Sequence, residues 1–156
     1  MIPRSKNFTN TQQPMFPILF RTHQGLERKI VSQETVENII VTAIEGGSNY
    51  WYLIEGKAQL AIEQYPKHKE EPFSIRFARF IFDGGQLEIH DCSSVWDLNE
   101  QADLLGTISN DSIAKGLKLA FEMQAGIIEA ELEGSGDAET SDQLFQLFVM
   151  GEIVYG

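Results

Sequence analysis

Residues 32–52, SQETVENIIVTAIEGGSNYWY, decide the fold class, because they predict a helix that leads through a turn into a strand. Ser32 is a residue type that accepts a hydrogen bond from an unpaired amide at a helix start. The apolar residues that follow recur with the helical period and form one stripe: Val36, Ile39, Ile40, Ala43 and Ile44. We expect Gly46 and Gly47 to end this helix, since glycine adopts the left-handed conformation common after a helix at little cost. The aromatic run at 50–52 then suits a strand.

The segment before this helix predicts a hairpin of two short strands. Residues 16–20, FPILF, suit a strand with a proline near its edge. Residues 23–25, HQG, supply a turn, and a second strand follows around residues 28–32. Residues 1–13 are polar, so we expect a disordered segment ahead of a domain that begins at residue 14.

The middle of the chain predicts further strands. Residues 58–65 alternate apolar and polar side chains, which favours a half-buried strand. Residues 73–82 fit either a helix or a strand. A turn at 83–85 precedes an alternating strand at 87–90, and residues 95–98 follow as the second strand of a hairpin.

The C-terminal third predicts helices. Ser109 or Asn110 begins a helix with one apolar face, which Gly126 interrupts. Residues 129–137 form an acidic, glycine-rich loop, and Asp137 begins a last helix that ends at Gly151. Helices and strands mix without a strict strand–helix–strand order, which favours an α+β fold. We expect a single compact domain over residues 14–156, with a small, mostly antiparallel sheet packed against about three helices.

The composition excludes several classes of protein. The chain has 156 residues, of which 42% are hydrophobic, enough for one domain with a core. No apolar run approaches the ~18 residues of a membrane-spanning helix, and the first residues do not have the pattern of a secretory signal. A single cysteine excludes an internal disulfide and a cysteine-rich zinc site. Twelve basic and 23 acidic residues give a net charge of −11, which argues against direct binding to nucleic acid.

The charge is unevenly distributed along the chain. Residues 1–33 carry five basic side chains and one acidic one, whereas the residues after Lys118 carry eight acidic side chains and no basic one. The simplest interpretation is that this acidic end forms a solvent-exposed face that keeps the protein soluble. The alternative is a contact surface for a basic protein, formed by Glu129, Glu131, Glu133, Asp137, Glu139 and Asp142. On a strand, the first three carboxylates would lie about 7 Å apart on one face, as in a protein that mimics nucleic acid.

Residues 45–51, EGGSNYW, are the richest candidate for a binding site. Glycine lets the backbone approach a ligand, while Asn, Tyr and Trp offer hydrogen bonds and a flat apolar face. The candidate binding residues here are Glu45, Gly46, Gly47, Asn49, Tyr50 and Trp51. The alternative is an ordinary helix end followed by aromatic core residues. Glu45 opposes the helix dipole, so it needs a buried hydrogen bond, an arginine from residues 76–79, or a function.

His90, Asp91 and Cys92 form the second candidate. On a strand, His90 and Cys92 point to the same face, which allows a metal ligand pair or a nucleophile and its base. A lone cysteine is more often a small buried apolar residue. The glycine pair at 84–85 lacks the helix start and lysine of a phosphate-binding loop. We therefore expect no metal, no cofactor and no assigned catalytic residue, and we keep His90 as a candidate binding residue.

Three blocks of the sequence resemble one family. Residues 41–51, VTAIEGGSNYW, resemble the signature T-A-x-E-G-G-x-x-Y-W of a family of small acidic proteins of tailed bacteriophages and prophages. Residues 84–91, GGQLEIHD, resemble its GGxLxxxD strand, and residues 142–156, DQLFQLFVMGEIVYG, resemble its ending in G-E-I-V-Y-G. Met150 stands where that family has an aromatic residue. Its members carry no assigned activity, so the resemblance implies an origin and one compact domain but no reaction.

Three functions are consistent with these observations. The first is a non-enzymatic accessory protein that binds a host or phage protein in the bacterial cytoplasm, in host takeover or counter-defence. Its expected contact surfaces are residues 46–51 and 129–142, and the apolar chain end favours a homo-oligomer. The second is a small-ligand-binding protein or enzyme with a pocket around Glu45, Asn49, Tyr50 and His90. The third is a minor structural component of the virion. No nucleic acid and no membrane is expected as a partner.

Overall fold

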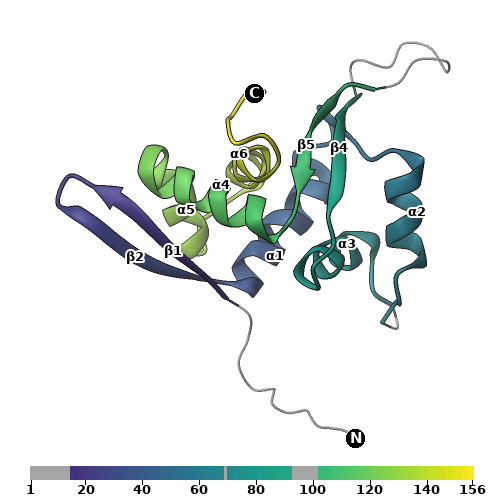
Figure 1. Ribbon diagram of the computed structural model, residues 1–156, viewed down its shortest axis with the longest axis horizontal. Helices are drawn as coiled ribbons and strands as arrows, with labels where there is room; N and C mark the ends of the chain where they lie inside the picture. Colours follow the sequence, from purple (N-terminus) through teal and green to yellow (C-terminus); the bar gives the residue numbers. More distant parts are fainter. Residues whose placement is uncertain (1–14, 69, 93–101) are drawn as a thin grey trace, which may run out of the picture.

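Two small antiparallel sheets and the helices around them make up residues 15–68, 70–92 and 102–156, which this computed structural model describes (Figure 1). The first sheet holds β1 (Met15–Thr22) and β2 (Gly25–Ser32). The second holds β3 (Tyr52–Leu53), β4 (Leu87–Asp91) and β5 (Leu104–Ile108), in the order β3-β4-β5. The architecture confirms the predicted single α+β domain. The predicted disordered segment 1–13 and the predicted strand 95–98 lie outside the described residues.

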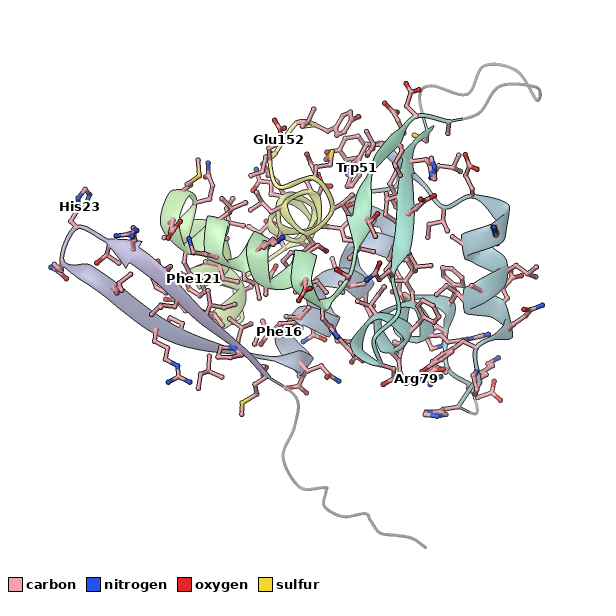
Figure 2. All side chains as sticks on the ribbon, in the orientation of Figure 1. Phe16, His23, Trp51, Arg79, Phe121 and Glu152 are labelled. Carbon is pink, nitrogen blue, oxygen red and sulfur yellow. The ribbon has the colours of Figure 1, made fainter. Side chains whose placement is uncertain are left out.

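β1 and β2 form the predicted hairpin. They pair along their full length across a two-residue turn. Ile18 and Phe20 are buried, whereas their neighbour Pro17 is exposed, so the two faces of the hairpin differ. The buried face packs against α4 (Asn110–Met123), where Phe20 stacks on Phe121 with ring centroids 4.6 Å apart. His23 lies at the far tip of the hairpin (Figure 2).

The first helix, α1 (Gln33–Thr42), starts as predicted but ends differently. Ser32 Oγ accepts a hydrogen bond from the Thr35 amide at 3.1 Å. A wider helical turn, η1 (Ala43–Gly47), follows α1, and Gly46 has an extended φ of 166°. The predicted left-handed cap at Gly46 and Gly47 is therefore wrong. A Cβ atom at Gly47 would lie 3.0 Å from the Ala138 carbonyl oxygen, so close packing is what requires glycine there.

The segment predicted as a strand at 58–65 is helical instead. It belongs to α2 (Gly56–Gln64), in which Ile62 is buried and Leu60 is exposed. Ala58, Ala61 and Ile62 lie three and four residues apart and face the protein, a helical spacing that the alternation concealed. The ambiguous residues 73–82 form α3 (Phe73–Phe82).

β4 is the predicted strand at 87–90. It buries Leu87 and Ile89 and pairs with β3 on one side and β5 on the other. The sheet therefore connects the turn at 48–51 with the start of α4.

The C-terminal helices begin where the sequence predicts. Ser109 caps α4, and Asp137 caps α6 (Ala138–Met150), which ends at the left-handed Gly151 with φ of 77°. The break after α4 lies at Gln124, and Gly126 lies inside α5 (Ala125–Leu132). Residues 129–132 are therefore helical, and the predicted acidic loop 129–137 is wrong over those residues. The core forms between the hairpin, the second sheet and helices α1, α3, α4 and α6.

Candidate functional site

Asp142 is buried at the centre of a hydrogen-bonded cluster, which corrects its predicted place on an acidic contact surface. Its Oδ1 accepts hydrogen bonds from Ser48 Oγ and Trp51 Nε1, both at 2.7 Å. Its Oδ2 accepts from the Tyr50 hydroxyl at 2.5 Å and from Gln146 Nε2 at 3.2 Å. We call these five residues the Asp142 cluster. A buried carboxylate is stable only when it is hydrogen-bonded in this way.

The chain end folds back onto this cluster. Gln146 Oε1 accepts hydrogen bonds from the backbone amides of Val154 and Tyr155 at 2.8 and 2.9 Å. The Tyr155 ring stacks on Trp51 at 5.5 Å, and its hydroxyl donates to Asp91 at 3.1 Å. Trp51 is therefore a core residue and not an exposed platform for a ligand.

These contacts join three separate blocks of the sequence, residues 41–51, 84–91 and 142–156. The turn at 48–51, the strand end at Asp91 and the last 15 residues meet through Asp142, Gln146 and Tyr155. Each Asp142 oxygen already accepts two hydrogen bonds, so the cluster acts as an anchor for the fold. Burial and then the hydrogen bond to Asp142 raise the pKa of Tyr50 to about 12.

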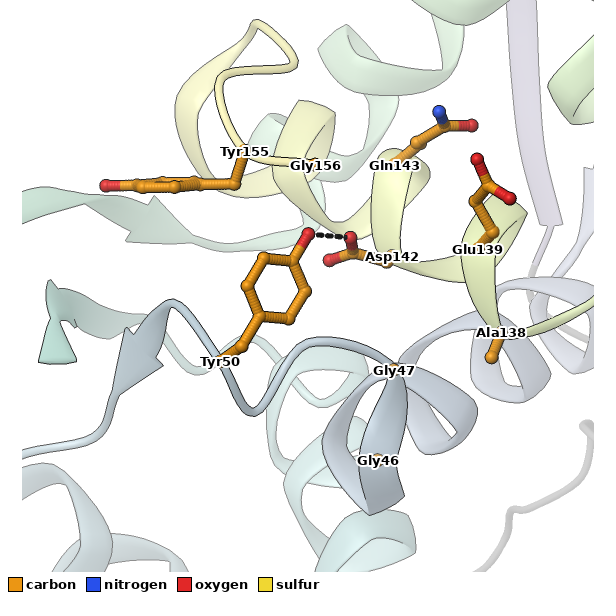
Figure 3. Close-up of a pocket in the computed structure, with 9 residues that line it drawn as sticks. All are labelled: Gly46, Gly47, Tyr50, Ala138, Glu139, Asp142, Gln143, Tyr155 and Gly156. Carbon is orange, nitrogen blue, oxygen red and sulfur yellow. Dashed lines mark hydrogen bonds between the residues drawn. The ribbon is translucent and has the colours of Figure 1, made fainter. Parts of the chain in front are cut away.

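A pocket of about 440 Å³ opens beside the cluster (Figure 3). Gly46 and Gly47 line one side, Glu139 of α6 lines another, and the Tyr50 ring and the chain end at Gly156 complete the rim. Tyr50 turns its hydroxyl towards Asp142, as Figure 3 shows. Of the residues predicted for binding, this pocket gathers Gly46, Gly47 and Tyr50.

The other predicted binding residues lie elsewhere. Asn49 lines a separate hollow with Ile44 and Phe73, and His90 lines a third with Glu55 and Glu88. Glu45 accepts a hydrogen bond from Ser74 Oγ at 2.6 Å, which is the compensating partner that its position required. The predicted grouping of Glu45, Asn49, Tyr50 and His90 thus corresponds to none of these three hollows.

The surroundings of His90 are acidic. Its Nε2 lies 3.9 Å from Glu55 Oε1 and 4.0 Å from Glu88 Oε1. Cys92 Sγ donates to the Tyr50 carbonyl oxygen at 3.2 Å. Among the residues that the structure describes, no three His, Cys, Asp or Glu side chains are arranged to hold a metal ion.

The predicted acidic surface is smaller than expected. Glu131 accepts hydrogen bonds from the hydroxyls of Thr140 and Ser141, both at 2.9 Å, so it joins α5 to the start of α6. Because residues 129–132 are helical, the carboxylates of the predicted mimic do not share a strand face. The exposed members of the set are Glu129, Glu133, Asp137 and Glu139.

The outer face of the hairpin is a feature that the sequence did not predict. We define this outer face as the solvent side of β1 and β2, made by Met15, Pro17, Leu19, Arg21, Leu26, Arg28 and Ile30. Four of its apolar side chains keep 53%, 54%, 61% and 53% of their area exposed, namely Met15, Leu19, Leu26 and Ile30. Exposed apolar side chains gathered on one face are typical of interaction surfaces. In the sequence, the alternation of Met15, Pro17 and Leu19 with Phe16, Ile18 and Phe20 could have predicted an exposed apolar face on β1.

Basic side chains lie on the outer face and beside it. Arg21 and Arg28 lie on it, and a shallow groove of about 190 Å³ beside Pro17 and Leu19 is lined by Lys115 and Lys118 of α4. Glu122 ties the hairpin to α4, because its Oε2 accepts a hydrogen bond from the Arg21 backbone amide at 2.9 Å. This bond, followed by the hydrogen bond from Lys118, lowers the pKa of Glu122.

In the part of the chain that the structure describes, no helix has the length and apolar character needed to cross a membrane. No protein-family model, curated protein or solved structure matches this chain.

Proposed function

We propose that this chain is a non-enzymatic binding protein that docks on a protein partner through the outer face of the β1–β2 hairpin. The observation that supports this function is the exposure of Met15, Leu19, Leu26 and Ile30 on one face of the hairpin, while the opposite face is used for packing on α4. Removing these side chains from water on binding would supply the driving force.

The chemistry of the outer face suggests the chemistry of the partner. Arg21 and Arg28 lie among the apolar side chains, and Lys115 and Lys118 lie beside Pro17 and Leu19, although the whole chain has a net charge of −11. The partner surface that fits combines apolar groups with carboxylates, since complementary charge sets specificity and speeds association. This differs from the basic partner that the acidic C-terminal end suggested.

The resemblance to phage and prophage proteins supplies the proposed setting. In this proposal the protein acts in the cytoplasm of a bacterial host on a host or phage protein, in host takeover or counter-defence. The small-ligand or enzyme hypothesis has less support, because Asn49, Tyr50 and His90 line separate hollows. A minor virion component would instead be found in purified particles.

Two matched variants test the proposal. Leu19→Lys changes the outer face, and Leu60→Lys makes the same change on α2, where the leucine is 51% exposed against 54% for Leu19. Tagged wild type and variants are used to capture proteins from nuclease-treated lysate of an infected host, with mass spectrometry as the readout. We expect a stoichiometric partner with the wild type and with Leu60→Lys, and its loss with Leu19→Lys at an unchanged melting temperature. Capture that is equal with all three proteins, or absent with all three, would contradict the proposal.

A further inference from the structure

The free edge of β2 supports an inference that goes beyond the outer face. We propose that two copies of this chain pair antiparallel along β2, with Arg28 of one copy opposite Arg28 of the other, to form a continuous four-stranded sheet. This pairing uses the strand edge, whereas the proposed function uses the face, so either can hold without the other.

The two edges of the hairpin differ in how they are covered. On β1, the Arg21 amide donates to Glu122 Oε2, so the Arg21 backbone points away from β2 towards α4. Along residues 26–31 of β2, no backbone group makes a hydrogen bond to a described backbone group outside β1. Figure 1 shows the helices on the β1 side of the hairpin and β2 as its outer edge. An uncovered edge strand is a template for another strand.

The register of the hairpin identifies which groups of β2 face outward. Arg21 pairs with Leu26, and in an antiparallel pair the inward and outward positions alternate on both strands. The backbone N–H and C=O of Leu26, Arg28 and Ile30 therefore point away from β1. Pro17, which lacks an N–H, pairs with Ile30 and so occupies an outward position on β1, in agreement with this assignment.

The side chains of β2 are self-complementary in one register. When Arg28 lies opposite its copy, Leu26 lies opposite Ile30 on the outer face, and Glu27 lies opposite Lys29 on the inner face. The two-fold axis makes each of these pairs twice. Opposite charges and apolar pairs across strands stabilise a sheet, and the single unfavourable pair is the central Arg28 with Arg28.

The neighbouring symmetric registers are worse. Centring on Glu27 places two glutamates opposite each other and puts Leu26 against Arg28. Centring on Lys29 places two lysines opposite each other and puts Arg28 against Ile30. The Arg28-centred register alone combines both favourable pairs with backbone groups that face each other. It also joins Leu26 and Ile30 of both copies into one larger outer face.

Charge reversal tests this register. Glu27→Lys places lysine opposite Lys29, and Lys29→Glu places glutamate opposite Glu27, so each variant should repel its own copy. We expect the wild type to form a dimer in sedimentation equilibrium, each single variant to dissociate about tenfold more readily or more, and a 1:1 mixture of the two variants to recover dimers. A monomeric wild type, or variants that dimerise as well as the wild type, would overturn the proposal.

A backbone variant tests the edge itself. Arg28→Pro removes a backbone N–H that points away from β1, and Pro17 shows that proline fits an outward position of this hairpin. Arg28→Ala keeps that N–H and removes the repulsion between the two Arg28 side chains. We expect Arg28→Pro to be monomeric with a melting transition still present, and Arg28→Ala to dimerise at least as tightly as the wild type. The Leu19→Lys variant should also dimerise, which separates a failure here from a failure of the proposed function. Dimers of folded Arg28→Pro would refute edge pairing. If Arg28→Pro does not fold, the mixture of the two charge-reversal variants still tests whether β2 pairs with its copy.

Discussion

Asp142 organises residues that are distant in the sequence. Its carboxylate accepts hydrogen bonds from Ser48, Tyr50 and Trp51, which lie more than 90 positions earlier in the chain. The same carboxylate orients Gln146, which holds the chain end in place. If the carboxylate were lost, Ser48 Oγ and Trp51 Nε1 would lose their acceptor inside the protein, and a buried donor without an acceptor is costly.

Asp142→Asn tests the role of this carboxylate. An amide group brings two donors to a position where four donors already converge, so at least one buried hydrogen bond is lost and one donor is left unpaired. We expect the free energy of unfolding to fall by about 2–4 kcal/mol in chemical denaturation. Glu133→Gln, a matched change on an exposed residue, should stay within about 0.5 kcal/mol. Equal effects of the two substitutions would show that Asp142 is not the anchor.

Tyr50 of the cluster and the neighbouring Tyr52 provide a pH test of this region. Burial raises the pKa of Tyr52 to about 12, and burial with the hydrogen bond to Asp142 raises the pKa of Tyr50 to about 12. A raised pKa favours the native state below the unfolded value near 10, and that stabilisation is lost as the pH rises through the native value. We expect little tyrosinate absorbance from the native protein at pH 10 and about half ionisation in denaturant. A native titration curve that coincides with the denatured one would contradict the described environment.

Residue type alone predicted charge and polarity but not the environment of each side chain. Asp142 and Glu131 belong to an acidic end of the chain, yet one is buried and the other binds two hydroxyls. The partners of Asp142 come mainly from the turn after η1, and those of Glu131 come from the start of α6, so only the tertiary fold brings these groups together. Glu45 shows the reverse case: its conflict with the helix dipole predicted a hydrogen bond, an arginine or a function, and the structure shows a hydrogen bond from Ser74.

At the scale of elements, local chemistry predicted the helix starts well. Ser32, Ser109 and Asp137 each accept the capping hydrogen bond that their residue types suggested. The wrong predictions arose where one stretch of sequence fits two kinds of local structure. Residues 58–65 fit both a strand and a helix, and contacts with the protein decide in favour of α2. The glycines after α1 were expected to cap a helix, but at Gly47 the nearby α6 backbone sets the requirement.

Two helical glycines give opposite predictions for the same substitution. A Cβ atom at Gly116 of α4 would lie 2.8 Å from the Phe148 ring and 2.9 Å from the Leu147 backbone of α6, whereas nothing lies within 4 Å at Gly126 of α5. We expect Gly116→Ala to destabilise the protein by about 1–3 kcal/mol, because α4 and α6 must move apart. Gly126→Ala should be neutral or should stabilise the protein by a few tenths of a kcal/mol. Alanine favours a helix interior over glycine by about 1 kcal/mol at most. Thermal denaturation of both variants checks the α4–α6 contact, and a harmless Gly116→Ala would contradict it.

At the scale of the molecule, the body and the hairpin have different chemistry. The body buries its apolar side chains around α6 and carries most of the negative charge, whereas the hairpin exposes apolar side chains beside arginines. A two-stranded hairpin has little stability of its own, so its docking on α4 through Phe20 and Phe121 fixes its position. The contact with α4 thus holds the outer face in the place where we propose that a partner binds.

Photo-crosslinking from position 19 is the most direct test of the central claim that a protein partner contacts the outer face. A photoreactive phenylalanine analogue replaces Leu19 in one protein and Leu60 in another, since both leucines are about half exposed. After irradiation in infected host cells, we predict a discrete adduct with a different protein from position 19 and none from position 60. Adducts with the same protein from both positions, or no adduct from position 19, would contradict the account.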